Sequence, residues 1–136
     1  MLAPDFTFTA IGTSWHISLE EELALTKKNA ILKAVQDRIG VFDETYSRFR
    51  QDSLISKIAS QAGEYILPAD AKLLFDLYFK LYKLTNGLMT PLVGQVLVDA
   101  GYDAQYSLIP KPLSQPPAWE EVLIYDCPKL TVKQPV

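Results

Sequence analysis

Residues 85–103, T-N-G-L-M-T-P-L-V-G-Q-V-L-V-D-A-G-Y-D, decide how we interpret the fold of this chain. An amphipathic helix runs into this stretch, and Asn86 and Gly87 form the pair expected to end it in a left-handed turn. Pro91 suits the first turn of a second helix, because the N–H that proline lacks would be unpaired there, and Gly101 closes that helix. The stretch therefore predicts two helices joined by a tight turn. A plain helical hairpin and an anion-binding helix end are both open interpretations of it.

Composition limits the class of protein. The chain has 136 residues, 49% of them apolar and 21% charged, which is the size and balance of one soluble globular domain. A net charge of -3 and only three arginines argue against nucleic acid as a partner. The single cysteine, Cys127, excludes an internal disulfide framework and a cysteine-rich metal site. No apolar run has the length of a membrane span and no secretory signal follows Met1, so we expect a cytoplasmic protein without membrane contact.

Strand-like alternation occurs at both ends of the chain. Near the N-terminus it flanks the small residues 12–14 and predicts a β-hairpin, with His16 on the polar face, where a surface role is commoner than catalysis. The alternating apolar positions are Phe6, Phe8, Ala10, Trp15, Ile17 and Leu19. A short extended piece is expected at 64–67 and further strands at 122–126 and 130–133. We expect nothing in the remaining residues to pair with the last strand or to cover it.

Two long segments carry apolar residues at helical spacing. The first follows the acidic residues 20–22 and ends near Phe42, and its apolar side is expected to pack on a sheet. The second is opened by Pro68, with Asp70 in its first turn, and its wide apolar stripe should supply most of the core. That stripe consists of Leu73, Leu74, Leu77, Tyr78, Leu81 and Leu84.

Arginine and aromatic side chains alternate at residues 46–50, in what we expect to be a loop. Arginine beside aromatic rings can hold a phosphate and stack on a flat ring. Arg48 and Arg50 can instead pair with acidic neighbours, and local chemistry favours this second interpretation. Those neighbours are Asp43, Glu44 and Asp52. Asp52 or Ser53 can also cap the short helix that follows.

Several catalytic chemistries lack their sequence pattern in this chain. There is no Gly-rich phosphate loop of Walker or Rossmann spacing, no G-x-S-x-G and no H-E-x-x-H. One histidine is too few for a histidine-cluster zinc site, and nothing points to a histidine-based triad. Asp99 and Asp103 lie four residues apart, which is only weak support for a metal site.

Three motifs occur in order: A-I-G-T-S-W at 10–15, F-D-E-T-Y-S-R-F-R-Q-D-S at 42–53, and the stretch 85–103. Together they resemble the N-terminal half of the ApbE-type flavin transferases, the FAD:protein FMN transferases. The resemblance spans nearly all of residues 1–136. It implies an α+β fold, T-fold-like, with a mixed or antiparallel sheet and helices packed on one face. It also implies that the C-terminal half of that domain lies outside these residues.

The resemblance implies a magnesium-dependent enzyme that splits FAD, attaches FMN through its phosphate to a threonine or serine hydroxyl of a target flavoprotein, and releases AMP. The metal-binding and catalytic residues of the family belong to the second half, so Mg²⁺ is expected only with that half and no catalytic residue is assigned to residues 1–136. FAD and the target flavoprotein are the implied partners. A complementing C-terminal half, or further copies of this chain in a homo-oligomer, are expected as structural partners. Members of the family are often membrane-anchored or periplasmic, but no lipid-bearing cysteine lies near Met1.

The same resemblance implies which residues of this chain contact FAD. Ile11 stands where the family usually has a methionine that touches the flavin, and Phe49 matches an aromatic position that contacts FAD. Leu88, Met89 and Thr90 match the A-F-D tripeptide that lines the FAD site. Thr90 is the most consequential departure, because it offers a neutral hydroxyl where the family has a carboxylate. The alternative function is a non-catalytic flavin-binding or protein-interaction module with the same fold.

Overall fold

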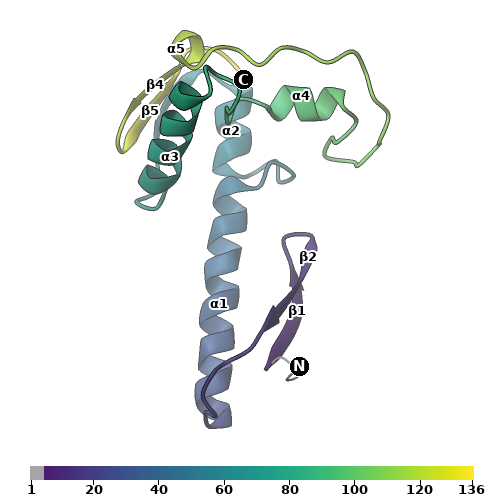
Figure 1. Cartoon of the computed structure of the whole chain (residues 1–136), viewed down its shortest axis with the longest axis vertical. Coiled ribbons are helices and arrows are strands. Elements are labelled where there is room, and N and C mark those ends of the chain that lie inside the picture. Colours follow the sequence, from purple (N-terminus) through teal and green to yellow (C-terminus); the bar gives the residue numbers. More distant parts are fainter. Residues whose placement is uncertain (1–4) are drawn as a thin grey trace. The chain divides into compact units, whose positions relative to one another are not determined.

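The computed structural model describes residues 5–136 and divides into two compact units, Met1–Ser47 and Arg48–Val136 (Figure 1). The first unit contains β1 (Phe6–Ala10), β2 (Thr13–Ile17) and α1 (Leu25–Tyr46). The second contains α2 (Leu54–Ser60), β3 (Gly63–Ile66), α3 (Ala71–Leu84), α4 (Gly94–Asp99), α5 (Trp119–Val122), β4 (Leu123–Asp126) and β5 (Lys129–Val132). The strands form small antiparallel sheets among helices, which confirms the predicted α+β class.

The N-terminal hairpin has the predicted two-residue alternation but a shorter turn. β1 and β2 pair antiparallel with Phe6 opposite Ile17, and His16 lies on the exposed face as expected. The turn consists of Ile11 and Gly12, with φ of 44° and 73°, so the predicted break at residues 12–14 is wrong. Two consecutive left-handed residues match the twist of the flanking strands, which is why so short a turn suffices. Ile11 is an unusual residue for it, because a β-branched side chain is strained at positive φ.

α1 is longer than predicted and begins later. It runs from Leu25 to Tyr46, so the acidic residues 20–22 precede it and Tyr46 belongs to the helix rather than to a loop. None of its residues is buried, so the predicted burial of its apolar side on a sheet is wrong. The Asp5 carboxylate accepts hydrogen bonds from Lys28 Nζ and, at 2.8 Å, from the Leu19 N–H. These two donors, Lys28 first, lower the pKa of Asp5.

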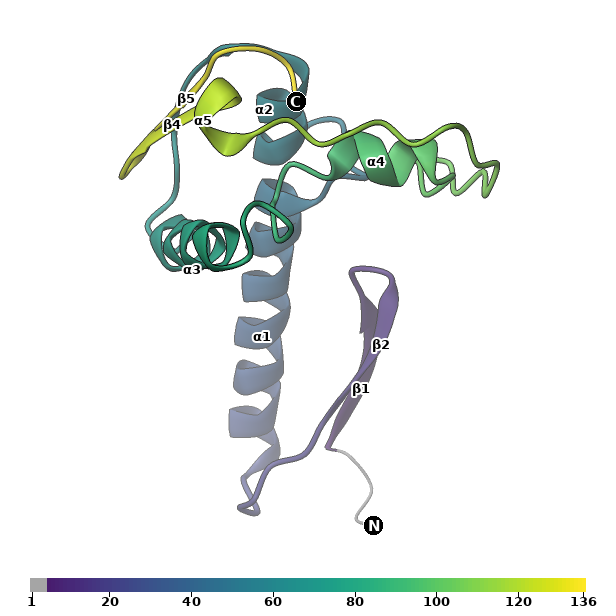
Figure 2. The ribbon, with the colours of Figure 1, turned by 45° about the horizontal axis from the view of Figure 1, so that its top comes forward.

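The second unit is built on a three-stranded antiparallel sheet in the order β3-β5-β4. The last strand, β5, is therefore the central one, because it pairs with β3 and with β4, which both precede it in the chain. Leu130 of β5 lies between Tyr65 and Tyr125 of its neighbours and is almost fully buried. The single turn of α5 leads directly into β4 (Figure 2). Its residues Trp119 and Val122 are buried.

The main contribution to the core does not come from the predicted leucine stripe of α3. Leu73 is 78% exposed and Leu84 is 70% exposed, whereas the helix contacts the core through its aromatic side. The rings of Phe75, Phe79 and Tyr82 surround Trp119, with centroid distances of 6.1, 5.6 and 5.9 Å. The buried apolar residues of the second unit are Ile58, Leu67, Ala71, Trp119, Val122, Leu123, Leu130 and Val132. Edge-to-face and tilted packing on one large indole thus decides which side of α3 faces inward.

Candidate functional site

The turn after α3 has the predicted geometry. Asn86 and Gly87 adopt φ of 49° and 84°, and the Gly87 N–H donates to the Tyr82 carbonyl at 2.8 Å, which closes the helix in a left-handed cap. α4 begins at Gly94 rather than at Pro91, so the prediction that proline opens this helix is wrong by three residues. With six residues, α4 is also too short to support the interpretation of an anion-binding helix end.

The three residues predicted to line the flavin site lie between these helices and differ in exposure. Leu88 is 89% exposed and Met89 is also exposed, although the Met89 N–H donates to the Thr85 hydroxyl at 2.9 Å. Thr90 is only 7% exposed, and its hydroxyl accepts the Leu92 N–H at 3.2 Å. The hydroxyl proton of Thr90 is the part of this group that can donate to a ligand. The turn therefore has two exposed apolar side chains, followed by one buried hydroxyl group that is held by a hydrogen bond.

Phe49 belongs to a cluster that we call the Phe49 cluster, made of Arg48, Phe49, Tyr102 and Tyr106. The Arg48 guanidinium carbon lies 4.2 Å from the Phe49 ring centroid and 4.4 Å from that of Tyr102, and Arg48 Nη2 donates to the Tyr102 carbonyl at 2.7 Å. The Phe49 and Tyr106 rings stack at 4.9 Å. Partial desolvation, followed by the hydrogen bond and charge of the neighbouring Tyr102, raises the pKa of Tyr106. Cation–π contact therefore places the positive charge of the cluster against its rings.

The interpretation of the arginines as partners of acidic neighbours is confirmed for Arg50. Arg50 pairs with Asp52, with Nε and Nη2 at 3.1 and 2.9 Å from the two carboxylate oxygens, as local chemistry favoured. Arg48 instead stacks on aromatic rings of this chain, and whether it can hold a phosphate stays a prediction. Ser53 is the residue that caps α2, since its hydroxyl accepts the Ser56 N–H at 3.0 Å.

Two aspartates fasten the loop that carries Tyr102 and Tyr106. Asp99 is buried and accepts hydrogen bonds from Gln95 Nε2 at 2.8 Å and from the Ser114 N–H at 2.9 Å. Asp103 accepts the backbone N–H groups of Gln105 and Ser107, both at 3.0 Å. The Ser114 side chain and then Gln95 lower the pKa of Asp99, and the Ser107 side chain and backbone lower the pKa of Asp103. Both carboxylates are thus occupied with loop hydrogen bonds.

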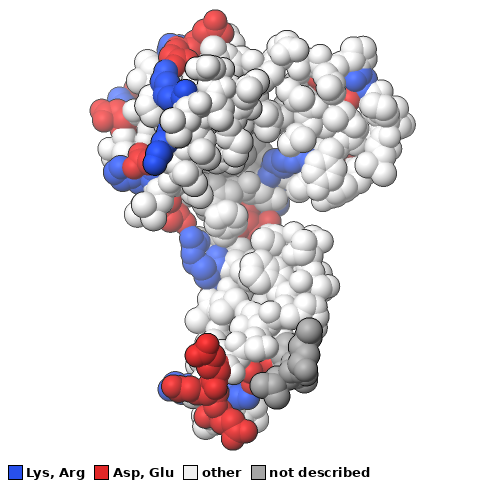
Figure 3. Space-filling view, in the orientation of Figure 1, with Lys and Arg blue, Asp and Glu red and all other residues white. Residues whose placement is uncertain are grey.

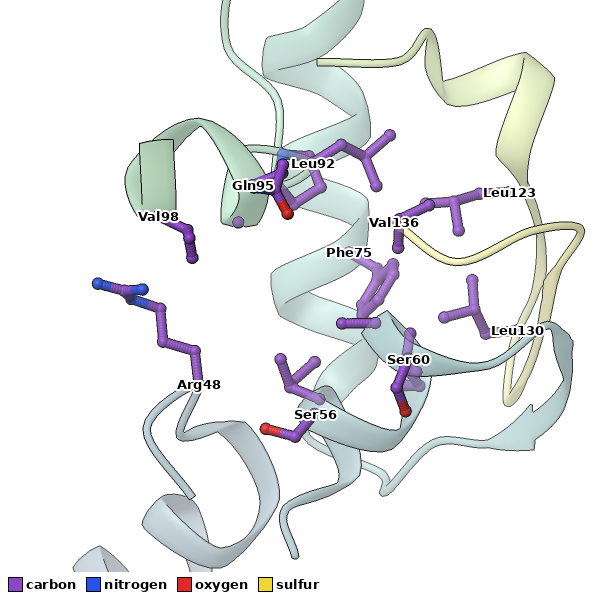
Figure 4. Close-up of a pocket in the computed structure, with 15 residues that line it drawn as sticks. Arg48, Ser56, Ser60, Phe75, Leu92, Gln95, Val98, Leu123, Leu130 and Val136 are labelled. Carbon is purple, nitrogen blue, oxygen red and sulfur yellow. The ribbon is translucent and has the colours of Figure 1, made fainter. Parts of the chain in front are cut away.

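A cavity of about 400 Å³ opens inside the second unit (Figure 4). Arg48 and Val98 stand at one end of it and Leu123 and Leu130 at the other. Most of its lining is apolar, and its polar side chains are Arg48, Ser56, Ser60 and Gln95. Pro91 and Leu92, which directly follow Thr90, also line it. The cavity is therefore bordered by the residue before Phe49 and by the two residues after Thr90.

The predicted site residues are thus only partly brought together. Phe49 and the stretch 88–90 lie in the second unit and adjoin residues of one cavity, whereas Ile11 lies at the hairpin tip of the first unit. Sequence reasoning missed Tyr102 and Tyr106, which complete the Phe49 cluster. The local signal for Tyr102 is its position directly after Gly101, whose φ of 88° is typical of the residue that follows a helix end.

Comparison with solved structures first defines the class of fold. The chain is similar to a flavinyl transferase ApbE of Pseudomonas stutzeri, with a TM-score of 0.66 and 16% identity over 95% of this chain and 46% of that one. It is also similar to a flavin transferase ApbE of Vibrio cholerae carrying an H257G substitution, with a TM-score of 0.76 and 15% identity over 96% and 47% of the two chains. Identity this low shows a common fold, that of the flavin transferases.

The family follows from the sequence itself. The model of the ApbE family matches residues 11–126, and the chain belongs to that family. None of the curated protein sequences matches this chain. The chain spans about half the length of the solved structures it matches.

Proposed function

We propose that this chain supplies part of the FAD site of an FAD:protein FMN transferase. The family match over residues 11–126 carries the proposal. The cavity in the second unit supports it, because its walls include Arg48 and Leu92, which adjoin two predicted flavin-contacting stretches. A volume of about 400 Å³ with few polar groups is typical of a site for a flat, largely apolar ring. The residues proposed to contact FAD are Ile11, Phe49, Leu88, Met89 and Thr90.

Each of these residues has a chemical role that its environment permits. Leu88 and Met89 are exposed apolar side chains that can cover one side of an isoalloxazine ring. The Thr90 hydroxyl, already held by the Leu92 N–H, can donate its proton to an oxygen of the flavin ring or sugar chain. Arg48 brings a permanent positive charge to the cavity wall, where a diphosphate can pair with it.

The proposed reaction transfers a phosphoryl-linked group. The hydroxyl oxygen of an acceptor threonine or serine attacks the FMN-side phosphorus of FAD, and a new P–O ester bond forms. The bond from that phosphorus to the bridging oxygen breaks, AMP leaves with the electron pair, and the hydroxyl proton passes to a base. Such transfer depends on positioning and on charge stabilisation rather than on a protein nucleophile. The chain's part in it is to bind and orient the flavin end.

Magnesium is proposed to act only together with residues of the second half of the fold. Within residues 5–136, no three acidic, histidine or cysteine side chains gather where they could hold a metal ion. Asp99 and Asp103, the pair considered from sequence, direct their carboxylates to loop N–H groups instead. The described residues therefore do not fit a magnesium site, and no step is assigned to the metal on this chain.

Titration with FAD tests the proposal directly. We expect the chain to quench flavin fluorescence on binding, and Phe49→Ala to weaken that binding by about tenfold, since truncating a central aromatic contact typically costs about 1–2 kcal/mol. The matched control is Phe79→Ala, which removes an aromatic ring of the same unit that packs on Trp119. Absence of quenching by the wild-type chain, or equal losses in the two variants, would contradict the proposed site.

AMP release separates the two candidate functions. For a transferase, addition of a polypeptide equivalent to the second half of the fold, with Mg²⁺ and an acceptor flavoprotein, should release AMP and label the acceptor with FMN. For a non-catalytic flavin-binding or interaction module, FAD binds and no AMP appears under the same conditions. A complementing half or a second copy of the chain is the proposed structural partner.

The cytoplasmic location stays a prediction, which cell fractionation tests. Across residues 5–136, no helix has both the length and the apolar character needed to cross a membrane.

A further inference from the structure

Arg48 is the only charged side chain among the described residues that line the cavity of the second unit. Figure 3 shows that charged side chains of both signs gather over α3 and α5, whereas the surface over α4 and the loop after it is mostly uncharged. Within residues 5–136, Arg48 contacts aromatic rings and a backbone carbonyl, and no carboxylate pairs with it. A permanent positive charge beside an apolar cavity, without an anionic partner, is suited to an anionic ligand group.

The guanidinium group of Arg48 is held in a defined position. Its carbon lies 4.2 Å from the ring centroid of Phe49 and 4.4 Å from that of Tyr102, and Nη2 donates to the Tyr102 carbonyl at 2.7 Å. A guanidinium has five N–H donors in one plane, so most of them have no partner within the described residues. Phosphate oxygens accept such N–H groups in pairs. The stacked arginine is therefore arranged to bind a phosphate.

The other polar side chains of the cavity already donate hydrogen bonds within the chain. The Ser56 hydroxyl donates to a backbone carbonyl at 2.5 Å, and the Ser60 hydroxyl donates to another at 3.1 Å. The Gln95 amide donates to the Asp99 carboxylate at 2.8 Å. Arg48 is thus the lining residue with the largest number of donors left for a ligand, and the remaining wall offers mainly apolar contact.

We propose that Arg48 binds a phosphate group of FAD and that Tyr102 positions its guanidinium, so that the site selects phosphorylated flavins over riboflavin. This inference rests on the proposed function and names the residues that recognise the phosphate. Arg48 directly precedes Phe49, one of the residues proposed to contact the flavin, so adjacent residues can hold the ring and the phosphate. A neutral flavin would desolvate the guanidinium without offsetting its charge, whereas a phosphate forms charge-assisted hydrogen bonds with it.

Calorimetric titration of the chain with riboflavin, FMN and FAD tests the proposal. The wild-type chain should bind FMN, FAD or both at least about tenfold more tightly than riboflavin, as expected for hydrogen bonds between charged groups. FMN carries only the flavin-side phosphate, whereas FAD carries the adenine-side phosphate as well. The ligand for which Arg48→Gln removes the preference therefore shows which phosphate Arg48 binds.

Arg48→Gln keeps a long side chain with an amide group but removes the charge. It should raise the dissociation constant of the preferred flavin at least about tenfold and change that of riboflavin less than about twofold. Riboflavin binding also shows that the variant is folded. The matched control is Arg50→Gln, which removes an arginine two residues away that pairs with Asp52. This control should change all three constants less than about twofold.

Two variants at position 102 test the positioning role. Tyr102→Ala removes the ring that stacks on the guanidinium and should weaken binding of the preferred flavin about two- to fivefold, without affecting riboflavin. Tyr102→Phe keeps the ring and the backbone carbonyl and should bind all three flavins as wild type does. Equal weakening of the three flavins by Tyr102→Ala would mean that the ring only maintains the structure of the Phe49 cluster.

Three outcomes would overturn the role of Arg48. They are equal affinity of the wild-type chain for the three flavins, a phosphate preference that Arg48→Gln leaves unchanged, and an equal loss of preference in Arg50→Gln.

The riboflavin titration distinguishes this failure from that of the proposed function. A chain that binds riboflavin, FMN and FAD equally well keeps its flavin site and refutes only phosphate recognition by Arg48. A chain that binds none of the three refutes the FAD site, and phosphate recognition with it.

Discussion

α3 and the loop at residues 102–113 differ in backbone regularity and in the interactions that hold them in place. α3 is a regular amphipathic helix, yet the leucines at 73 and 84 are exposed and the helix is fixed by aromatic contacts with Trp119. The loop has no regular structure, yet Asp99 and Asp103 bind its backbone at several points. A helical apolar stripe therefore does not identify which side of a helix is buried. An irregular segment, in turn, can be rigid when its N–H groups have carboxylate partners.

The largest effect should come from the residue that fixes α3. Trp119→Ala removes a ring that is nearly fully buried against three aromatic neighbours, and we expect a loss of about 3–5 kcal/mol in the free energy of unfolding. Leu73→Ala on the exposed side of the same helix should change it by less than about 0.5 kcal/mol. Urea unfolding of both variants measures the difference. A larger loss for Leu73→Ala would show that the leucine stripe is the buried side after all.

The next effect concerns the point where the loop crosses the end of α4. Gly101→Ala places a Cβ against the backbone at Ile109 and requires positive φ for alanine, so a loss of about 1–3 kcal/mol is expected. Gly94→Ala is the matched control at the other end of the helix, where an added Cβ meets nothing within 4 Å and φ is ordinary. The urea concentrations at the unfolding midpoints of the two variants measure this difference in stability. Equal midpoints would mean that the loop does not approach Gly101 closely.

Acid should release the hydrogen bonds that hold the loop. The pKa values of Asp99 and Asp103 are lowered in the folded chain, by the Ser114 side chain and Gln95 for the first and by Ser107 for the second. Their stabilisation is thus complete above the unfolded pKa of about 3.9 and is lost as the pH falls through the lower folded values. We therefore expect the NMR chemical shifts of the backbone amides of Ser107 and Ser114 to change below about pH 4, as their hydrogen bonds to the two carboxylates are lost.

The double variant Asp99→Asn and Asp103→Asn separates this effect from those of other acidic groups. Asp5, Asp52 and Glu120 also have lowered pKa values and contribute to the acid response of the whole chain. In the double variant the loop shifts should no longer depend on pH in this range. An unchanged pH dependence would assign the effect to those other carboxylates.

Features that depend on hydrogen bonds between residues close in sequence could be predicted from the sequence. The left-handed end of α3 at Asn86 and Gly87, the Ser53 cap and the alternation of the hairpin are all confirmed. The family and the α+β class also followed from ordered motifs. Whether Phe49 and the stretch 88–90 contact FAD stays a prediction.

Contacts between distant segments could not be predicted in the same way. The position of Trp119, 37 residues after Tyr82, selects the buried side of α3, and nothing in the helix itself indicates this partner. The Phe49 cluster requires Tyr102, which lies 54 residues after Arg48. The pairing of β5 with β3, which lies far back in the chain, was not predicted either. Pairings of high sequence separation leave no periodic signal in either segment.

The smallest expected effect concerns the hairpin tip, where the proposed function opposes local stability. Ile11 occupies the first position of a turn that favours asparagine or glycine, so Ile11→Asn should stabilise the hairpin by about 0.5–1 kcal/mol. If Ile11 contacts the flavin, the same variant should also bind FAD more weakly, because an apolar contact is replaced by an amide. Thr13→Asn, next to the turn, is the control that adds an amide without relieving strain. A variant at position 11 that is more stable and binds FAD as tightly as wild type would remove Ile11 from the site, and the strain at that position would have no functional explanation.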